Sequence, residues 1–423
     1  MNRAILALNI GSSSLKFALY RAQPLNLIER GAVTGLGAAA EAEFVARSER
    51  GQQRVESLPP GIDDEGAVRW LLANLCKRFP DTQLAAIGHR VAHGGMCYDG
   101  AVFVNEGVLG ELESLVPLAP EHQPPALAAI RVAAALHADV PQIACFDTTF
   151  HRRMPWYSRR FALPRAMQHD GIVRFGFHGL SYEYIASVLP VVAGARATGR
   201  VIVAHLGHGA SLCAMRNLQS MATTMGFTPL DGLMMGTRCG AIDPGVVLHL
   251  LKSRRMDVDE VYDLLAHKSG LRGVSGISSD VRELEASNDP HAQEALELFA
   301  HHAATGIAAQ CAAIGGLDVL VFTAGIGEHA AELRARTCTR LGWLGIALDT
   351  HANAGDARRI SERGSMVDVY VIRTNEELVI ARAATRLLGC GSECAPKDPV
   401  DIDHMCTTKT KHAADVSLRG EVP

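Results

Sequence analysis

The sequence predicts an α/β fold, because strand-like and helix-like segments alternate through most of the 423 residues. The length favours two or three domains, each large enough for a core of its own. A pattern of strand, glycine turn and strand also occurs near the N-terminus and again at residues 201–215. We expect this repeat to mark two related halves that could grip a polyphosphate between them, although two similar hairpins could also arise by chance.

The first hairpin is a candidate phosphate-binding turn. Strand-like runs at residues 5–10 and 15–20 flank a turn made of Gly11 and Ser12–Ser14. Such a turn can direct backbone amides and hydroxyls toward an anion, and Lys16 adds a positive charge beside it. The turn is therefore predicted to hold a phosphate, with an ordinary β-hairpin as the alternative.

The elements after this hairpin follow from apolar periodicity, capping residues and glycine stops. One strand leads into His89-Arg90 and another into Asp147, at the kind of strand end where α/β folds bind ligands. In chain order we expect a helix within 60–80, a strand at 84–88, a helix at 125–138, a strand at 142–146, a helix from Asp289-Pro290 to about residue 313, strands at 318–322 and 369–372, and a last helix opened by Glu376 and Glu377.

Two later glycine turns are candidate nucleotide-binding segments. The first lies inside the second hairpin, and the second lies between a strand and a helix, where backbone amides at the helix N-terminus favour anions. They contain His205, Gly207, His208 and Gly209 in the first turn, and Gly325, Ile326 and Gly327 in the second. Tight packing of a strand against a helix would use the same glycines.

Four side chains are candidates for chemistry on an anionic substrate. Arg90 and Arg238 lie beside glycines, where a planar guanidinium can bind two oxygens of a carboxylate or phosphate. His178 lies between glycines and could donate to a transferring phosphoryl group, and Asp147 ends a buried strand. The alternatives are surface ion pairs for the arginines, a loop-holding role for His178 and a capping role for Asp147.

Acidic residues at two predicted helix starts also fit structural roles. Asp280, followed by Arg282 and Glu283, has the spacing of a helix start and could equally contact an adenine. Glu376 and Glu377 would favour the dipole of the last helix. Their presence alone is therefore poor support for a metal site.

Composition and charge argue against several classes of function. Hydrophobic residues make up 48% and charged residues 20%, which is typical of soluble globular proteins. A net charge of −4 gives no electrostatic reason to expect a nucleic acid or membrane partner. No apolar run reaches the roughly 18 residues of a membrane helix, and the N-terminal residues show no signal-peptide pattern. Ten cysteines without a C-x-x-C pair favour a reduced, cytoplasmic protein.

In this order, the segments resemble the acetate kinase family of acyl-phosphate-forming kinases, from the superfamily of sugar kinases, actin and chaperone ATPases. The resemblance covers about residues 4–388, and the ordered set of motifs is very specific. The motifs are Asn-x-Gly-Ser-Ser-Ser-x-Lys (9–16), His-Arg-Val-x-His-Gly-Gly (89–95), Phe-Asp-Thr-x-Phe-His (146–151), Phe-Gly-Phe-His-Gly (175–179), His-Leu-Gly-x-Gly-Ala-Ser (205–211), the segment from Met225 to Arg238, Gly-Ile-Gly-Glu (325–328) and Thr-Asn-Glu-Glu-Leu (374–378).

The resemblance implies two duplicated domains of the actin-like, ribonuclease H-like ATPase type around a nucleotide cleft. The first domain would comprise residues 1–149 and a returning C-terminal helix at 376–390. The second, residues 150–375, would bind nucleotide and form a homodimer. Residues 391–423 are polar and lack periodicity, so we expect a mobile tail there.

The resemblance also implies reversible, Mg²⁺-dependent transfer of the ATP γ-phosphoryl group to acetate, giving acetyl phosphate and ADP and linking acetate to acetyl-CoA metabolism. Mn²⁺ is an alternative metal. Because a short-chain carboxylate is already ionised at neutral pH, the difficulty is to bring this anion to a polyphosphate. The resemblance implies catalytic roles for Arg90, Asp147, His178 and Arg238, and carboxylate binding by Arg90, Ala92, His122, Phe177 and Pro229. It implies metal binding by Asn9 and Glu376, with Asp147. The residues implied in nucleotide binding are Lys16, His205, Gly207, His208, Gly209, Asp280, Val281, Arg282, Gly325, Ile326 and Gly327.

Several residues depart from the usual pattern of the family. His208 replaces Asn, and an imidazole titrates near neutrality, so we expect pH-sensitive nucleotide affinity. Ala92 replaces Val and leaves room for one more substrate carbon, which makes propionate or another short-chain acid the alternative substrate. Glu121 replaces Leu at an apolar pocket, where a carboxylate is costly; it would point to solvent or contact a more polar substrate. Gln123 replaces the Asn that follows His122.

A non-catalytic, actin-like nucleotide-binding protein is the third alternative. Arg90, Asp147, His178 and Arg238 are retained together. A protein that only binds nucleotide has no need of this carboxylate-binding set, so the sequence favours an enzyme.

Overall fold

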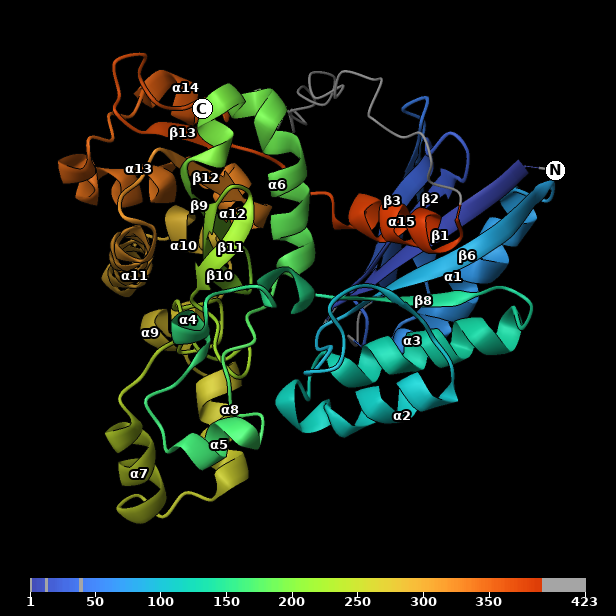
Figure 1. Cartoon of the computed structure of the whole chain (residues 1–423), viewed down its shortest axis with the longest axis horizontal. Helices are drawn as coiled ribbons and strands as arrows, with labels where there is room; N and C mark the ends of the chain where they lie inside the picture. The colour runs from blue at the N-terminus through green and yellow to red at the C-terminus, as the bar shows by residue number, and fades with distance from the viewer. Residues whose placement is uncertain (1, 12–13, 38–40, 390–423) are drawn as a thin grey trace, which may run out of the picture. The chain divides into compact units, whose positions relative to one another are not determined.

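The computed structural model describes residues 2–11, 14–37 and 41–389 (Figure 1). Predictions that fall on Ser12 and Ser13 of the first glycine turn, on residue 390 and on the expected tail lie outside the described residues. The described chain has two β-sheets with helices on their faces, which confirms the α/β class.

An eight-stranded sheet is formed by residues from the first part of the chain. Its strand order is β5-β4-β3-β2-β1-β6-β8-β7; β1 pairs antiparallel with β2 and parallel with β6, which is itself parallel to β8. Its strands are β1 Asn2–Ile10, β2 Ser14–Arg21, β3 Leu27–Thr34, β4 Ala42–Ser48, β5 Gln53–Leu58, β6 Thr82–Val91, β7 Val102–Phe103 and β8 Gln142–Phe146. We call residues 2–146 the first lobe.

A five-stranded sheet lies in the second part of the chain, and we call residues 150–371 the second lobe. Its strand order is β11-β10-β9-β12-β13. Here β9 pairs antiparallel with β10 and parallel with β12, which is parallel to β13. The strands are β9 Arg200–Leu206, β10 Ala210–Arg216, β11 Gln219–Thr223, β12 Val319–Thr323 and β13 Asp368–Val371.

The two sheets share one topology. In each, the first strand forms a hairpin with the second, the third adds beyond the second, and two later strands add in parallel on the other side of the first. The order β3-β2-β1-β6-β8 in the first lobe thus matches β11-β10-β9-β12-β13 in the second. The repeated hairpin predicted from the sequence is therefore part of a duplicated sheet.

Helices cover the sheets, and short 3₁₀ turns join some of them. The helices are α1 Asp64–Arg78, α2 Glu106–Ser114, α3 Gln123–Leu136, α4 Trp156–Arg159, α5 Arg165–His169, α6 Gly179–Ala193, α7 Pro244–Lys252, α8 Val258–His267, α9 Gly270–Ser275, α10 Val281–Ala286, α11 Pro290–Ile314, α12 Ala324–His329, α13 Ala331–Arg340, α14 Thr350–Ala354 and α15 Glu376–Leu387. The 3₁₀ turns are Val116–Leu118, Thr149–His151, Gly194–Thr198 and Gly342–Leu344.

Three apolar clusters define the layers. Helices α1 and α3 pack on one face of the first sheet, through residues such as Leu71 and Ile130. Helix α11 packs on one face of the second sheet, through residues such as Phe299. Helices α6 and α15 lie between the sheets and share a cluster with both, through residues such as Ile185 and Ile380 (Figure 1). Helix α15 thus returns to β1 and β6 although it ends the described chain.

Most predicted elements are confirmed, with shifted ends. Helix α11 is capped by Asp289, whose side chain accepts from the amide of His291, and stops at Gly315 in the left-handed region. Strand β6 extends through His89 and Arg90 to Val91, further than expected. Helix α3 begins two residues earlier than expected, at Gln123, and ends two residues earlier, at Leu136.

One predicted turn is wrong. Gly325, Ile326 and Gly327 form no loop ahead of a helix, because α12 already begins at Ala324, directly after β12. Ala324 has φ 66°, so the chain turns from strand to helix within one residue. The two glycines therefore lie in the first turns of α12.

Candidate active site

Three polar side chains meet at one edge of the sheet of the first lobe. Asn9 lies near the end of β1, Arg90 near the end of β6, and Asp147 directly after β8. Because these three strands are parallel to one another, their carboxyl ends lie at the same edge. This convergence makes the strand ends the natural place for a ligand.

Arg90 and Asp147 form a buried ion pair. Arg90 donates from Nε at 3.0 Å and from Nη2 at 2.6 Å, and both bonds go to Oδ2 of Asp147. Burial raises the pKa of Asp147, and the Arg90 guanidinium opposes that rise. The other oxygen, Oδ1, is buried and accepts no hydrogen bond of ordinary geometry. Asp147 therefore has a lone pair available to a bound group.

The N-terminus of α15 adds two carboxylates to this edge. Asn9 Nδ2 donates to Glu376 Oε2 at 2.8 Å and to Glu377 Oε1 at 3.1 Å, and Arg90 Nη1 donates to Asn9 Oδ1 at 3.4 Å. Burial alone would raise the pKa of Glu376, but Arg90, His205 and Lys16 outweigh it and the pKa is lowered. Glu376 is thus a partly buried, ionised carboxylate.

Lys16 lies opposite Asn9 in the register of β1 and β2, with an exposed side chain. Its charge lowers the pKa of both Glu376 and His205. It therefore contributes positive potential beside Glu376 and His205, and its role in nucleotide binding stays a prediction.

The second lobe contributes a histidine held by a chain of hydroxyls. His178 precedes α6 in the left-handed region, with φ 59°. Its Nδ1 lies 2.8 Å from Ser211 Oγ, which lies 2.5 Å from the hydroxyl of Tyr182. Burial lowers the pKa of His178 well below its usual value, and His205, Arg90 and Arg238 lower it further. The ring is therefore neutral at physiological pH.

His205 stacks on His178, with ring centroids 4.1 Å apart, and its Nδ1 lies 2.8 Å from Ser181 Oγ. Burial lowers the pKa of His205 to about 4. Ser181 and Tyr182 were missed from the sequence. The one available signal was their position in the first turn of the helix that follows His178.

Arg238 brings a second guanidinium toward His178. Its side chain is buried, and Nη1 donates to the carbonyl of Pro229 at 2.9 Å. A Cβ built on Gly209 would lie 3.2 Å from His178 Nε2 and 3.3 Å from Arg238 Nη2, so the glycine lies against both groups. The second glycine hairpin thus borders the candidate phosphoryl-binding groups.

His122 connects the two lobes electrostatically. Burial lowers its pKa to about 3, and the charges of Arg238, Arg90 and His208 act in the same direction. The pKa of this one imidazole is therefore lowered by arginines from both lobes. The predicted side chains from the two lobes consequently lie within one electrostatic environment.

The predicted apolar positions lie beside this cluster. Ala92 and Phe177 are buried, and the His93 ring packs edge-to-face against Phe177 with centroids 5.6 Å apart. Gln123 is fully buried: its Oε1 accepts from the His93 amide at 3.1 Å, and its Nε2 donates to the His93 carbonyl at 3.0 Å. Gln123 therefore fixes the loop that follows Ala92.

Glu121 is held by two side chains of the second lobe. The Tyr262 hydroxyl donates to its Oε1 at 3.2 Å, and His267 Nε2 lies 2.6 Å from the same oxygen. It is therefore partnered and not free in solvent, and contact with a more polar substrate stays a prediction. Its charge raises the pKa of Arg238 against the effect of burial. Glu121 is thus a partnered carboxylate near Arg238.

His208 lies in the second glycine turn. Partial burial lowers its pKa from the usual value, and the Arg238 guanidinium lowers it further. This shift favours the neutral ring, and the pH-sensitive nucleotide affinity expected from the sequence stays a prediction. The backbone of this turn is well fixed: Gly207 N donates to Gly209 O at 3.0 Å, and Gly236 N donates to His208 O at 3.0 Å.

The remaining candidates for nucleotide binding lie in the second lobe. Asp280 caps α10, accepts from the Arg282 amide at 2.9 Å and pairs with Arg282 Nη2 at 2.5 Å, whereas Val281 is buried. The helix-start arrangement of Asp280 is therefore present. Gly327 O accepts from Arg334 Nη1 at 3.0 Å.

Glu328, which was not among the candidates, ties the ends of β12 and β13 together. Its Oε1 accepts from the amides of Ala324 at 2.9 Å and of Thr374 at 3.1 Å. The hydroxyls of Thr323 and Thr374 are buried there without a hydrogen-bond partner. They are polar groups that a ligand at these strand ends could satisfy.

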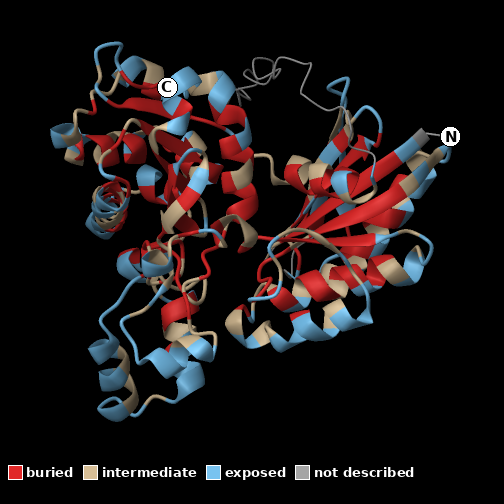
Figure 2. Ribbon diagram, viewed as in Figure 1, coloured by how far each residue is buried: buried red, intermediate tan, exposed pale blue. Residues whose placement is uncertain are grey.

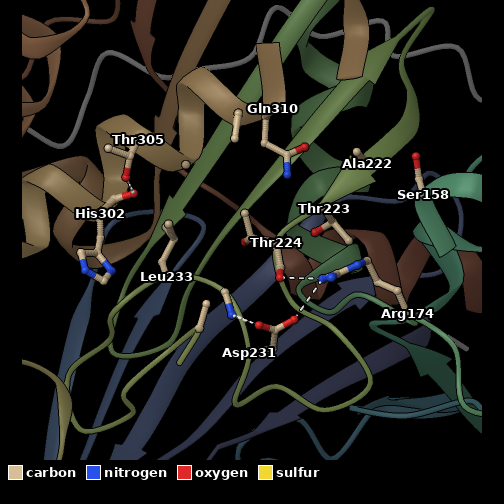
Figure 3. Close-up of a pocket in the computed structure, with 14 residues that line it drawn as sticks. Ser158, Arg174, Ala222, Thr223, Thr224, Asp231, Leu233, His302, Thr305 and Gln310 are labelled. Carbon is tan, nitrogen blue, oxygen red and sulfur yellow. Dashed lines mark hydrogen bonds and ion pairs between the residues drawn. The ribbon is translucent and has the colours of Figure 1, made fainter. Parts of the chain in front are cut away.

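A separate hollow of about 530 Å³ lies between β11 and α11 (Figure 3). Arg174, which lines it, already pairs with Asp231 at 3.2 Å and donates to the carbonyl of Thr224 at 2.8 Å. None of the residues named from the sequence as candidates for catalysis or for binding substrate, nucleotide or metal lines this hollow. It is distinct from the cluster of strand-end side chains.

The strand-end cluster fits a magnesium ion bound mainly through water and phosphate. Within the described ranges, no three His, Cys, Asp or Glu side chains are placed to hold a metal ion together. Mg²⁺ usually keeps several waters and binds one or two protein carboxylates plus substrate phosphates. The ionised Glu376 and the unpartnered Oδ1 of Asp147 supply such oxygens.

Among the described helices, none is both long and apolar enough to cross a membrane.

Solved structures define the fold class. The chain is similar to a propionate kinase from Francisella tularensis, with a TM-score of 0.83 and 35% identity over 90% of this chain and 98% of that one. It is similar to an acetate kinase from Porphyromonas gingivalis, with a TM-score of 0.79 and 34% identity over 91% of this chain and 100% of that one. The fold is that of the actin-like ATPases.

Sequence relatives define the family. The chain belongs to the acetokinase family, whose model matches residues 4–382. An acetate kinase from Rhodopseudomonas palustris is 52% identical over 92% of this chain and its own full length. An acetate kinase from Methylocella silvestris is 44% identical over 92% of this chain and 98% of that relative. The resemblance seen in the motifs is confirmed.

Proposed function

We propose that the chain is an acetate kinase, which transfers the γ-phosphoryl group of ATP reversibly to acetate and forms acetyl phosphate and ADP. The observation that carries this proposal is the convergence of Arg90, Arg238 and a neutral His178 at one site. Two guanidiniums offset the repulsion between a carboxylate and a polyphosphate. Family membership agrees with this chemistry.

In the proposed mechanism, Arg238 and Arg90 bind the carboxylate and then the oxygens of the phosphoryl group in flight. The loose, in-line transition state spreads negative charge over those oxygens, and fixed cations stabilise it most. Both guanidiniums are held before substrate arrives, Arg90 by Asp147 and Arg238 by the Pro229 carbonyl. They therefore need little reorganisation during the reaction.

His178 would donate a hydrogen bond to the phosphoryl group from Nε2. Burial raises the pKa of Tyr182 well above its usual value, so its hydroxyl keeps its proton. Either atom of the Tyr182–Ser211 pair could be the donor. Assigning Tyr182 as donor to Ser211, and Ser211 as donor to Nδ1, places the proton of the neutral ring on Nε2. That nitrogen faces Gly209 and the Arg238 guanidinium. A neutral ring can donate this hydrogen bond, and no proton has to be taken from the substrate, because the carboxylate is already ionised.

Mg²⁺, with Mn²⁺ as an alternative, would be held or oriented by Asn9, Glu376 and Asp147, where it would neutralise charge on the nucleotide phosphates. The nucleotide would bind the second lobe along Gly207–Gly209 and the start of α12, with Asp280 and Arg282 toward the nucleoside. Helix N-termini and glycine turns suit phosphates because their amides are free to donate. Ala92, His122, Phe177 and Pro229 would enclose the carboxylate.

The first domain is proposed to comprise residues 1–149 and 376–390, and the second domain residues 150–375. The second domain is proposed to form the homodimer. Helices α4, α7 and α8 are largely exposed (Figure 2). Large apolar residues are exposed there, including Trp156 on α4, Leu248 on α7 and Val258 on α8, the last with 73% of its surface exposed. Exposed apolar patches commonly mark protein interfaces. A cytoplasmic location, where ATP is available, is part of the proposal.

Hydroxylamine trapping tests the reaction and its acid. Incubation with ATP, Mg²⁺ and acetate, propionate or butyrate should yield the hydroxamate of the acyl phosphate, with acetate the best substrate. Propionate is the second candidate, because Ala92 is smaller than the Val that the family commonly has at this position. A higher kcat/KM for propionate would reassign the substrate, and no hydroxamate from any acid would refute the kinase proposal.

A further inference from the structure

Glu121 joins the two lobes beside the candidate site. It lies in the loop before α3 of the first lobe, and both of its partners lie on α8 of the second. The Tyr262 hydroxyl donates to Oε1 at 3.2 Å, and His267 Nε2 lies 2.6 Å from the same oxygen. The three residues Glu121, Tyr262 and His267 form an interlobe contact that we call the α8 clasp.

Further polar contacts and ring packing accompany the α8 clasp. His267 Nδ1 lies 3.0 Å from Asp263 Oδ1, so both ring nitrogens of His267 lie beside carboxylates. Lys268 also pairs with Asp263. The Tyr262 ring packs edge-to-face on His267, and burial with the charge of Glu121 raises the pKa of Tyr262 to about 12, which keeps its hydroxyl protonated.

The last turn of α8 is bonded directly to the loop that carries Arg238. Thr237 Oγ1 donates to the Ala266 carbonyl at 2.9 Å, and the Cys239 amide donates to the Leu265 carbonyl at 3.0 Å. Both neighbours of Arg238 in the chain are therefore attached to the turn that ends in His267. A shift of this turn would move the Arg238 backbone with it.

The loop has little room to adjust independently. Gly270 follows α8 with φ 63°, and a Cβ built there would lie 2.9 Å from the carbonyl oxygen and 3.0 Å from the amide nitrogen of Arg238. The Arg238 guanidinium is buried and donates to the Pro229 carbonyl. Its position thus depends on backbone contacts that α8 supplies.

We propose that Glu121 is a positioning residue, which anchors α8 to the first lobe and thereby holds Arg238 in place for the carboxylate substrate. This inference rests on the proposed kinase function. It assigns a role to a carboxylate that the pocket chemistry alone would disfavour. Glu121 need not touch the substrate, because it acts through His267, Tyr262 and the end of α8.

Steady-state kinetics of Glu121→Gln, with acetate and ATP varied separately, test the proposal. We expect the KM for acetate to rise about tenfold while the KM for ATP stays within about twofold, since misplacing one substrate-binding group affects mainly that substrate. Tyr262→Phe, which removes only the hydroxyl, should shift the acetate KM in the same direction by a smaller factor. Glu113→Gln, which breaks an exposed ion pair of the first lobe with Arg131, is the matched control and should change neither KM.

A double variant distinguishes loss of this contact from a general loss of stability. Glu121→Gln combined with His267→Gln should be no worse than Glu121→Gln alone, because both remove the same contact. An unchanged acetate KM in Glu121→Gln, or an equal rise in both KM values, would overturn the inference. Wild-type protein that forms no acyl phosphate would instead refute the proposed function and, with it, this inference.

Discussion

Arg90 donates two hydrogen bonds to the same oxygen of Asp147, from Nε at 3.0 Å and from Nη2 at 2.6 Å, so that Oδ1 is buried without one. An ion pair built only for stability would be expected to engage both oxygens. Here one oxygen holds the arginine and the other remains available to a bound group. In the proposed mechanism the pair would combine a structural and a ligand-binding role.

We expect Asp147→Ala to destabilise the protein by about 3 kcal/mol, because removing one partner of a buried pair leaves the Arg90 charge poorly compensated. The free energy of unfolding from urea denaturation measures this. Glu113→Ala, which breaks the exposed pair with Arg131, is the control and should cost less than about 1 kcal/mol. Equal losses in the two variants would mean that the Arg90–Asp147 pair has no special contribution.

Gly209→Ala should lower kcat by about 10²-fold while leaving the protein folded, because the added methyl would press on both His178 Nε2 and Arg238 Nη2. Gly110→Ala is the matched control: a Cβ there meets nothing within 4 Å, and the residue lies inside α2. Turnover with saturating ATP and acetate is the measurement. A Gly209→Ala enzyme with wild-type kcat would show that the two side chains do not act from these positions.

Buried histidines should make the protein less stable in acid. The pKa values of His89, His93, His151 and His205 are lowered to about 4 by burial. Between pH 6.5 and 4 the unfolded chain therefore binds protons that the folded protein does not, so stability falls as pH falls. Each histidine contributes up to about 2 kcal/mol to this loss at pH 5.

Urea denaturation at pH 7 and pH 5 measures the loss. His151→Asn should lose less stability than the wild type over this interval, because it removes one of the titrating groups. Equal free energies of unfolding at the two pH values in the wild type would contradict the neutral state of these histidines.

The KM for ATP should stay constant between pH 7 and pH 8.5. The pKa of His208 is lowered from its usual value by partial burial and by Arg238, so its ring is neutral throughout this range. The comparison variant is His208→Asn, which cannot titrate. A wild-type ATP KM that changes severalfold over this interval, with a flat response in His208→Asn, would restore the titration first expected from the sequence.

Much of the site was predictable because its residues follow buried strands or lie in glycine turns. Asn9, Arg90 and Asp147 end strands whose apolar runs are visible in the sequence, and parallel pairing brings such ends together. The repeated hairpin likewise predicted the duplicated sheet. These features depend on local pattern and on general rules of α/β topology.

The remaining features depend on contacts between distant segments. Glu121 and Tyr262 are 141 residues apart, and nothing local to either indicates the contact. The lowered pKa of His208 depends on burial and then on Arg238, which belongs to another loop. The start of α12 at Ala324 was missed because a left-handed alanine is rare and a glycine turn was the more natural expectation.

Transfer of the γ-phosphoryl group is tested most directly by ³¹P NMR of the full chain with ATP, Mg²⁺ and acetate. An acyl phosphate signal should grow in equal amount with ADP, and Arg238→Ala should slow it by about 10²- to 10³-fold. ADP formed with inorganic phosphate in place of acyl phosphate, or no consumption of ATP with acetate, propionate or butyrate, would contradict a carboxylate kinase.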